Sequence, residues 1–229
     1  MDVYQGILNV IAEKQKGLAI LVDPDKFLVA QAAEFIAQIP EQTTHLFVGG
    51  SSVLENATET VVCALKSKTT LPLLLFPGDY TQLTPGADAL LFLSLISGRN
   101  VEYLIEQQLK AVSFLKASKL EVIPTGYILI DGGNESAVAR VSKTLPMSQD
   151  HIELIVETAL AGQYMGAKLI YLEAGSGALF PVKPDIIAAV KKEIDIPIVV
   201  GGGVRRESQW QSAYKAGADM VVMGTAFEK

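Results

Sequence analysis

The last third of the chain contains three glycine-rich segments, Tyr171-Leu-Glu-Ala-Gly-Ser-Gly177, Val200-Gly-Gly-Gly203 and Val222-Met-Gly-Thr225. Each segment follows a short apolar run typical of a buried strand and precedes a pattern typical of a helix. Glycine lets the backbone approach a ligand closely, and unpaired N–H groups at a turn attract an anion. Three successive strand ends of this kind predict a phosphate site at the mouth of a parallel barrel.

The same alternation of strand and helix extends back to the start of the chain. Most of the apolar runs are nearly continuous, as expected for parallel strands that are covered on both faces. The predicted strands are 18–22, 44–48, 72–76, 87–93, 122–130, 168–173, 197–200 and 219–223. The predicted helices are 2–15, 29–38, 52–67, 100–117, 150–165, 183–193 and 206–216. Eight strands that alternate with helices predict a (βα)₈ barrel.

One connection departs from this regular pattern. Residues 77–86 contain two prolines and two glycines, which leave no room for an ordinary helix. We therefore expect an α/β fold, a modified (βα)₈ TIM barrel whose third helix is missing or replaced by an irregular segment. No linker or low-complexity tract interrupts the chain, so residues 1–229 are predicted to form a single domain. Residues 131–149 form an unusually long connection, which favours a functional loop.

Composition narrows the classes of function. Hydrophobic residues make up 49% of the 229 residues, so a large core is expected, and the net charge of −6 argues against a nucleic-acid partner. The single cysteine, Cys63, excludes a disulfide framework and favours a cytoplasmic protein; we expect it in the core. The longest apolar runs fall short of the ~20 residues that a membrane span requires.

Two motifs near the first strands carry candidate metal ligands. Asp23 directly follows the first strand in Asp23-Pro-Asp-Lys26, where its carboxylate is well placed at the barrel mouth to bind Mg²⁺. The alternative is a helix cap or an Asp-Pro turn. Ser51 lies in Gly49-Gly-Ser-Ser52 after the second strand, and its hydroxyl is a candidate contact for a metal or a phosphate. The alternative makes Ser51 or Ser52 the N-cap of a helix that begins near Val53.

The sixth strand carries a candidate catalytic carboxylate. Strand alternation sends Tyr171 and Glu173 to one face and Leu172 to the other. If that face is the barrel interior, Glu173 lies at its rim, next to the predicted phosphate site, where it can accept the proton of a substrate hydroxyl. The alternative is a structural ion pair with a lysine.

The last two strand ends complete the predicted site. A triple glycine is hard to explain by packing because each glycine adds chain entropy to the unfolded state, so phosphate binding is the favoured interpretation of Gly202 and Gly203. Gly224 and Thr225 end the last strand. Arg205 and Arg206 can also assist, although exposed arginines before a helix are usually solvated.

Taken together, these motifs resemble those of the geranylgeranylglyceryl phosphate synthase family, prenyltransferases that include the bacterial heptaprenylglyceryl phosphate synthases. The matching segments are Val22-Asp-Pro-Asp-Lys26, Phe47-Val-Gly-Gly-Ser51, Tyr171-Leu-Glu-Ala-Gly-Ser-Gly177, Val200-Gly-Gly-Gly-Val204 and Val222-Met-Gly-Thr225. The segment Ile123-Pro-Thr-Gly-Tyr127 is similar to the branch with archaeal and Bacteroidetes members. The resemblance also implies a barrel without a regular third helix. One departure is Leu21, because some bacterial relatives have a lysine there.

The resemblance implies an enzyme that joins sn-glycerol 1-phosphate to a prenyl diphosphate, most simply geranylgeranyl diphosphate, and releases diphosphate. It implies Mg²⁺ as the cofactor, held by Asp23 and Ser51. It implies that Glu173 and Tyr171 are catalytic. The glycerol phosphate would be held by Tyr171, Leu172, Glu173, Ala174, Gly175, Ser176, Gly177, Gly202, Gly203, Gly224 and Thr225.

Two further properties follow from the resemblance, and two other functions stay open. We expect a homo-oligomer, either a dimer or a hexamer, and a transient contact with a membrane surface for product release. The rival functions are a sugar-phosphate isomerase or aldolase and a non-enzymatic barrel that binds a phospholigand. The isomerase or aldolase would need neither a long apolar groove nor the metal site, so apolar lining around Tyr80, Leu93 and Tyr127 would favour the prenyltransferase. The non-enzymatic barrel would release no diphosphate from any prenyl diphosphate.

Overall fold

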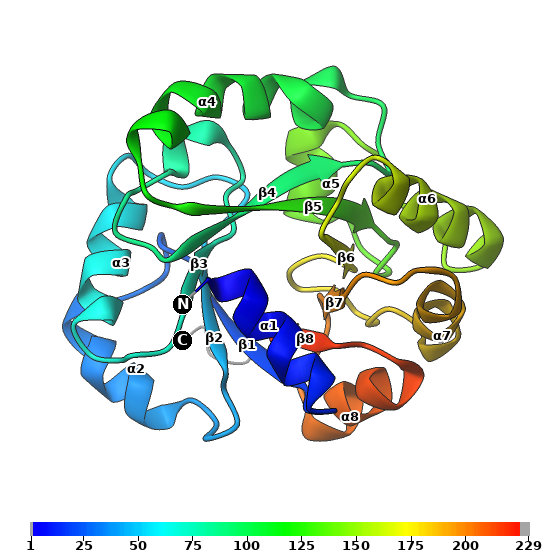
Figure 1. Ribbon diagram of the computed structural model, residues 1–229, viewed down its shortest axis with the longest axis horizontal. Helices are drawn as coiled ribbons and strands as arrows, with labels where there is room; N and C mark the ends of the chain where they lie inside the picture. The colour runs from blue at the N-terminus through cyan, green and yellow to red at the C-terminus, as the bar shows by residue number, and fades with distance from the viewer. Residues whose placement is uncertain (1, 225–229) are drawn as a thin grey trace.

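Each predicted apolar run forms a strand, and the strands close into a parallel barrel in chain order (Figure 1). The computed structural model describes residues 2–224. Every observed strand lies within two residues of its predicted bounds. The strands are β1 (Gly17–Val22), β2 (His45–Val48), β3 (Leu73–Leu75), β4 (Ala89–Leu95), β5 (Glu121–Leu129), β6 (Leu169–Glu173), β7 (Ile198–Gly201) and β8 (Met220–Met223). The predicted (βα)₈ architecture is therefore confirmed.

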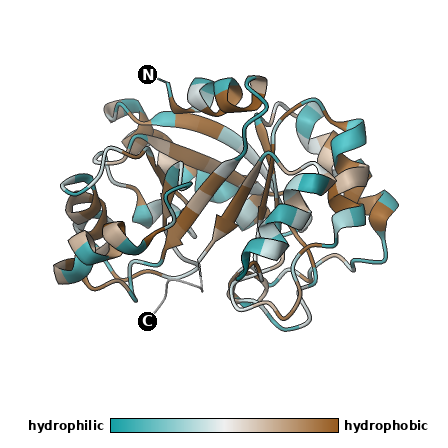
Figure 2. Ribbon diagram, turned by 90° about the horizontal axis from the view of Figure 1, so that it is seen from below, coloured by the Kyte–Doolittle hydropathy of each residue, from teal (hydrophilic) through white to brown (hydrophobic). Residues whose placement is uncertain are grey.

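Strand alternation divides the apolar side chains into an inner and an outer layer. Ala19, Phe47 and Tyr171 belong to the inner layer, which fills the barrel, whereas Leu18 and Leu172 belong to the outer layer beneath the helices. Both faces of the strands are thus buried, which explains why the strand sequences are hydrophobic without interruption. Figure 2 shows the same arrangement, with hydrophobic strands inside helices whose outer faces are largely hydrophilic.

The helices surround the barrel, and α1 lies across its amino end (Figure 1). Val3 and Ile7 of α1 pack into the inner layer, so this helix closes the floor of the barrel. The helices and shorter turns are α1 (Val3–Ala12), η1 (Val29–Gln31), α2 (Ala32–Gln38), α3 (Ala57–Lys66), η2 (Tyr80–Gln82), η3 (Glu102–Glu106), α4 (Gln107–Ala117), α5 (Ala137–Ser142), α6 (Ile152–Tyr164), α7 (Pro184–Glu193) and α8 (Glu207–Ala216). In the described part of the chain, no helix is both long and apolar enough to cross a bilayer.

The third βα unit has the predicted irregular connection. The three-residue 3₁₀ turn η2 stands between β3 and β4 in place of a helix. β3 is also short and pairs with β4 only through Leu74 and Leu75. The upper half of β4 therefore has no neighbouring strand on that side, which leaves room for a groove in the barrel wall.

Several local predictions are wrong. Helix α3 begins at Ala57 rather than near residue 52, because Asn56 takes a left-handed conformation with a φ of 63° that stops the helix there. Neither Ser51 nor Ser52 is therefore an N-cap. Cys63 is exposed, not in the core, because it lies on the outer face of α3 between inward-facing neighbours.

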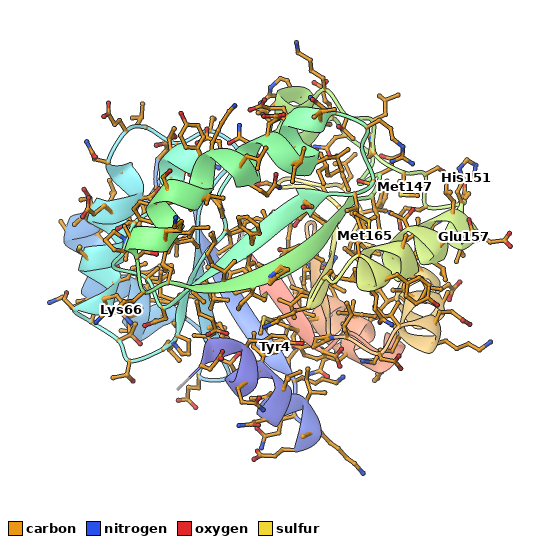
Figure 3. The ribbon with its side chains drawn as sticks, turned by 45° about the horizontal axis from the view of Figure 1, so that its top comes forward. Tyr4, Lys66, Met147, His151, Glu157 and Met165 are labelled. Carbon is orange, nitrogen blue, oxygen red and sulfur yellow. The ribbon has the colours of Figure 1, made fainter. Side chains whose placement is uncertain are left out.

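Two helical segments differ from the predicted secondary structure. The predicted helix 100–117 begins with a π-helical turn, η3, before α4. The long connection 131–149 contains a short helix, α5, which sequence reasoning missed and whose N-cap is the Ser136 hydroxyl. At the start of α6 no side chain caps the helix; His151 stands at the N-cap and points into solvent (Figure 3).

Candidate active site

A polar pocket of about 1190 Å³, including its solvent-open part, lies at the carboxyl ends of the strands. It brings together residues from the ends of β1, β2, β6, β7 and β8, which are far apart in the sequence. The predicted site residues that line it are Asp23, Ser51, Tyr171, Glu173, Ser176, Gly202, Gly203 and Gly224. The motifs chosen from the sequence therefore converge on one cavity, because parallel strands all end at the same edge of the barrel.

Asp23 directly follows β1, and its carboxylate faces the loop after β2. Its Oδ1 accepts the N–H of Asp25, and its Oδ2 lies 3.2 Å from Lys26 Nζ. A Cβ added at Gly50 would lie 3.2 Å from Asp23 Oδ1, so glycine is what allows this close approach. The Asp-Pro turn and the metal role are thus compatible, because Oδ1 accepts the N–H of the turn and Oδ2, which contacts Lys26, has a second lone pair that can bind a metal.

The donor set fits Mg²⁺ only with help from a substrate. Among residues 2–224, no group of three His, Cys, Asp or Glu side chains is placed to hold a metal. One carboxylate and one hydroxyl, Asp23 and Ser51, do share the pocket. Mg²⁺ is commonly bound in this way, by one or two protein oxygens together with waters and substrate phosphates.

Glu173 is a buried carboxyl group at the end of β6. Its Oε1 accepts the N–H of Gly175 at 2.6 Å. No lysine, arginine or histidine of the described chain forms an ion pair with it, so the structural ion pair is not found. Burial raises the pKa of Glu173 from 4.5 to about 7, although the Gly175 N–H and the nearby Tyr171 hydroxyl favour the ionised form. A carboxyl group with this pKa is well matched to accept a proton at neutral pH.

Tyr171 lies one layer below Glu173 in the barrel. Its ring stacks on Phe76 at a centroid distance of 5.1 Å, and the side chain is fully buried. Its hydroxyl makes no hydrogen bond of good geometry. Burial, followed by the neighbouring Glu173 charge, raises the pKa of Tyr171 well above its usual value, so the hydroxyl stays protonated. A buried, unpaired hydroxyl that faces a pocket is ready to bond a ligand.

Backbone N–H groups supply the candidate phosphate contacts. The N–H groups of Ser176, Gly202, Gly203 and Val204 have no hydrogen-bond partner among the described residues, and all four residues line the pocket. Gly202 has a φ of 80°, and a Cβ there would lie 2.4 Å from Glu173 Oε1. This glycine is therefore required both by the turn and by the close packing of two loops. Free N–H groups on adjacent turns form an anion-binding concavity.

The remaining predicted contacts are placed differently. Leu172 faces the outer layer, so only its backbone is near the pocket. The N–H of Ala174 bonds the Gly201 carbonyl, and that of Gly175 bonds Glu173, so both donors are already occupied. Gly177 does not line the pocket. Thr225 lies outside the described residues.

An apolar groove of about 810 Å³, including its open part, begins beside the polar pocket. It lies where the third helix is missing, between η2, β4, α4 and α5. Tyr80, Leu93 and Tyr127 line it, so the apolar lining expected around these residues is present. Sequence reasoning missed the wall that α5 contributes through Val138, since nothing in the 131–149 connection indicated that a helix returns to the mouth.

The groove and the polar pocket meet at a shared wall. Gly50, Ser51, Phe76, Tyr127 and Val138 line both cavities. The ring of Tyr127 lies 5.9 Å from that of Phe76. A molecule with an apolar tail in the groove would therefore hold its head beside aromatic rings, the candidate metal ligands and Glu173.

Comparisons with known proteins agree with this geometry. The PcrB family model matches residues 9–229. The chain is 56% identical to a geranylgeranylglyceryl phosphate synthase of Zunongwangia profunda, over 99% of this chain and 97% of the relative. It is 40% identical to that of Thermococcus kodakarensis, over 95% and 86%. The crystal structure of (S)-3-O-geranylgeranylglyceryl phosphate synthase from Thermoplasma acidophilum, in complex with sn-glycerol-1-phosphate, superposes with a TM-score of 0.92 at 35% identity, covering 100% of this chain and 92% of that chain.

Proposed function

This chain belongs to the PcrB family, and we propose that it is a prenyltransferase. It joins sn-glycerol 1-phosphate to a prenyl diphosphate, with geranylgeranyl diphosphate as the expected donor, and releases diphosphate. The observation that carries this proposal is the apolar groove that opens directly into a polar pocket with free N–H donors. Two substrates of opposite character, a phosphate and a long hydrocarbon, fit these two cavities side by side.

The protein residues divide the work of the reaction. Free N–H groups bind the phosphate of the acceptor, and the Tyr171 hydroxyl is available to its glycerol oxygens. The acceptor hydroxyl oxygen forms a bond to the first carbon of the prenyl chain while the bond from that carbon to the diphosphate oxygen breaks. The proton of the hydroxyl passes to the Glu173 carboxylate. Holding both substrates at near-contact distance supplies a large part of the rate.

We propose Mg²⁺ as the cofactor, with Asp23 and Ser51 as its protein ligands. The ion would neutralise the charge of the leaving diphosphate. The junction of the two cavities supports this assignment, because Ser51 lines both and Asp23 lines the polar one. The N–H groups of Gly50, Ser51 and Ser52 also have no partner in the described chain and can bind diphosphate oxygens.

The rival functions explain less of the structure. A sugar-phosphate isomerase or aldolase would use the glycine-rich cradle but would have no use for the groove. A barrel that only binds a phospholigand does not account for a buried carboxyl group whose pKa is about 7 beside the phosphate site.

The proposal is tested by product identification. The protein is incubated with Mg²⁺, sn-glycerol 1-phosphate and either farnesyl, geranylgeranyl or heptaprenyl diphosphate, and the lipids are analysed by mass spectrometry. We expect the ether product and diphosphate, with geranylgeranyl diphosphate preferred. The mirror-image sn-glycerol 3-phosphate serves as the control acceptor. Absence of an ether with every donor would overturn the proposal.

Two surfaces support further proposals about partners. Leu28, Leu54, Leu179 and Phe180 are exposed in connections at the mouth, which supports a transient contact with a membrane for product release. Sedimentation with phosphatidylcholine vesicles tests this contact.

Val101, Ile105, Leu109 and Val112 form an exposed apolar stripe along η3 and α4, which supports a homo-oligomer, a dimer or a hexamer. Light scattering after gel filtration measures that state. Cytoplasmic localisation is likewise a proposal, consistent with a lone, unpaired cysteine.

A further inference from the structure

One positively charged side chain of the polar pocket has no partner of opposite charge among the described residues. Asp23, Asp25, Lys26, Glu173 and Arg205 line the pocket. Lys26 lies 3.2 Å from the Asp23 carboxylate, so part of its charge is compensated. Arg205 forms no salt bridge with any described residue. Its positive charge therefore stands beside the free N–H groups without an anionic partner.

Arg205 also joins two loops that follow different strands. Its Nη2 donates to the Ala178 carbonyl at 3.0 Å and approaches the Gly177 carbonyl at 3.4 Å. The side chain starts in the loop after β7 and ends on the loop after β6. The unpaired N–H groups of Ser176 and Val204 lie on these same two loops. The guanidinium thus links the two loops that carry these unpaired donors.

The backbone of Arg205 is held independently of its side chain. Gln209 Oε1 accepts the N–H groups of both Arg205 and Arg206, at 2.8 Å and 3.0 Å. Replacing the side chain therefore leaves the start of α8 anchored. Arg206 is also exposed but does not line the pocket, which makes it a matched control.

We propose that Arg205 is a positioning residue for the acceptor phosphate: it clamps the loop after β6 against the loop after β7 and places a positive charge beside their free N–H groups. The inference rests on the proposed function, because it takes the phosphate of the acceptor as the ligand of this pocket. A planar guanidinium suits both tasks, since its forked donors can hold carbonyl oxygens while its charge attracts an anion. The positive charge of Arg205, which no described carboxylate pairs, helps a chain of net charge −6 to attract a phosphate dianion here.

The test compares Arg205→Gln, Arg205→Lys and the control Arg206→Gln with the unmodified enzyme. Calorimetry measures binding of inorganic phosphate and of sn-glycerol 1-phosphate, and steady-state kinetics measures kcat and KM. We expect Arg205→Gln to raise the Kd for both anions and the KM for sn-glycerol 1-phosphate about tenfold, with kcat nearly unchanged at saturation. Arg205→Lys should recover only part of the affinity, because an ammonium keeps the charge but lacks the planar, forked donor geometry and the longer reach of a guanidinium. Arg206→Gln should bind as the unmodified enzyme does.

A second measurement separates positioning from a general loss of structure. Amide hydrogen exchange should accelerate over residues 176–180 in Arg205→Gln, while the melting temperature stays within about 2 °C. Normal anion affinity in Arg205→Gln, or an equal loss in Arg206→Gln, would overturn the inference. If the unmodified enzyme binds sn-glycerol 1-phosphate but forms no ether with any donor, the proposed function fails while the binding comparison still decides the role of Arg205.

Discussion

Replacing Glu173 by glutamine is the most informative perturbation of this site. Glutamine keeps the shape and the oxygen that accepts the Gly175 N–H at 2.6 Å, but it cannot take a proton. General-base assistance is typically worth ~10²–10⁴-fold, so turnover should fall by about that factor. In the unmodified enzyme, turnover should fall about tenfold per pH unit below about 7, where Glu173 becomes protonated. That limb of the pH profile should be absent from the glutamine variant.

Glu173→Gln should also change how the free energy of unfolding depends on pH, and the raised pKa of Glu173 sets the direction of that change. Burial raises the pKa of Glu173 from 4.5 to about 7, so the folded state binds a proton more tightly than the unfolded state. The stability associated with this proton is fully present below about pH 4.5 and is lost as pH rises through about 7. A rise in pKa of this size lowers the free energy of unfolding by about 3 kcal/mol between the two pH values. For a chain of this length, that corresponds to roughly 6–12 °C in Tm. The side chain of the glutamine variant stays neutral at every pH, so its free energy of unfolding should not fall in this way.

The assay measures melting temperature at about pH 4.5 and pH 8, together with turnover per folded molecule. The Tm of Glu173→Gln relative to the unmodified protein should increase by roughly 6–12 °C between the two pH values. Glu157→Gln, a change on the exposed face of α6 (Figure 3), is the control for loss of one charge. Near-normal turnover in Glu173→Gln, or a Tm difference that does not depend on pH, would refute the reasoning.

Three other substitutions test the remaining parts of the site. Asp23→Asn should lower turnover more than tenfold at limiting Mg²⁺ without loss of Tm, and unchanged diphosphate release would remove Asp23 from the metal site. Tyr171→Phe removes a buried hydroxyl that makes no hydrogen bond of good geometry, so the free energy of unfolding should change by no more than about 1 kcal/mol, while calorimetry shows weaker binding of sn-glycerol 1-phosphate. Ala111→Trp should fill the apolar groove and raise the KM for the prenyl donor at least tenfold, with acceptor binding intact. Leu109→Trp, on the exposed stripe, is its control, and equal effects from both would argue against the groove.

Much of this protein follows from local sequence because its signals are local. Parallel strands buried on both faces must be hydrophobic along their whole length, so the eight strands were visible as apolar runs. The absence of a third helix was equally visible, since the prolines of residues 77–86 prevent helix formation. The strand ends then had to meet at one edge of the barrel, which brought Asp23, Glu173 and Gly202 into one pocket.

Other features depended on contacts between distant segments. No pattern around Asn56 showed that α3 would start late, and no pattern around 137–142 showed that α5 would return to line both cavities. The pKa of Glu173 could not be derived from its neighbours in sequence, because it depends on the burial of the side chain in the assembled barrel. The same holds for Arg205, whose sequence context resembles that of a solvated arginine.

The sequence by itself determined the order of strands and helices, the missing third helix and the residues at each strand end, because these depend on periodicity, proline and glycine within a few residues. Only the tertiary structure decided which of the N–H groups near the phosphate site remain free, where the apolar groove opens and what surrounds Glu173. Each of these depends on which atoms from other strands and loops come within hydrogen-bonding or packing distance. The occupied N–H of Gly175 and the free N–H of Ser176 are adjacent in the chain, yet only the fold distinguishes them.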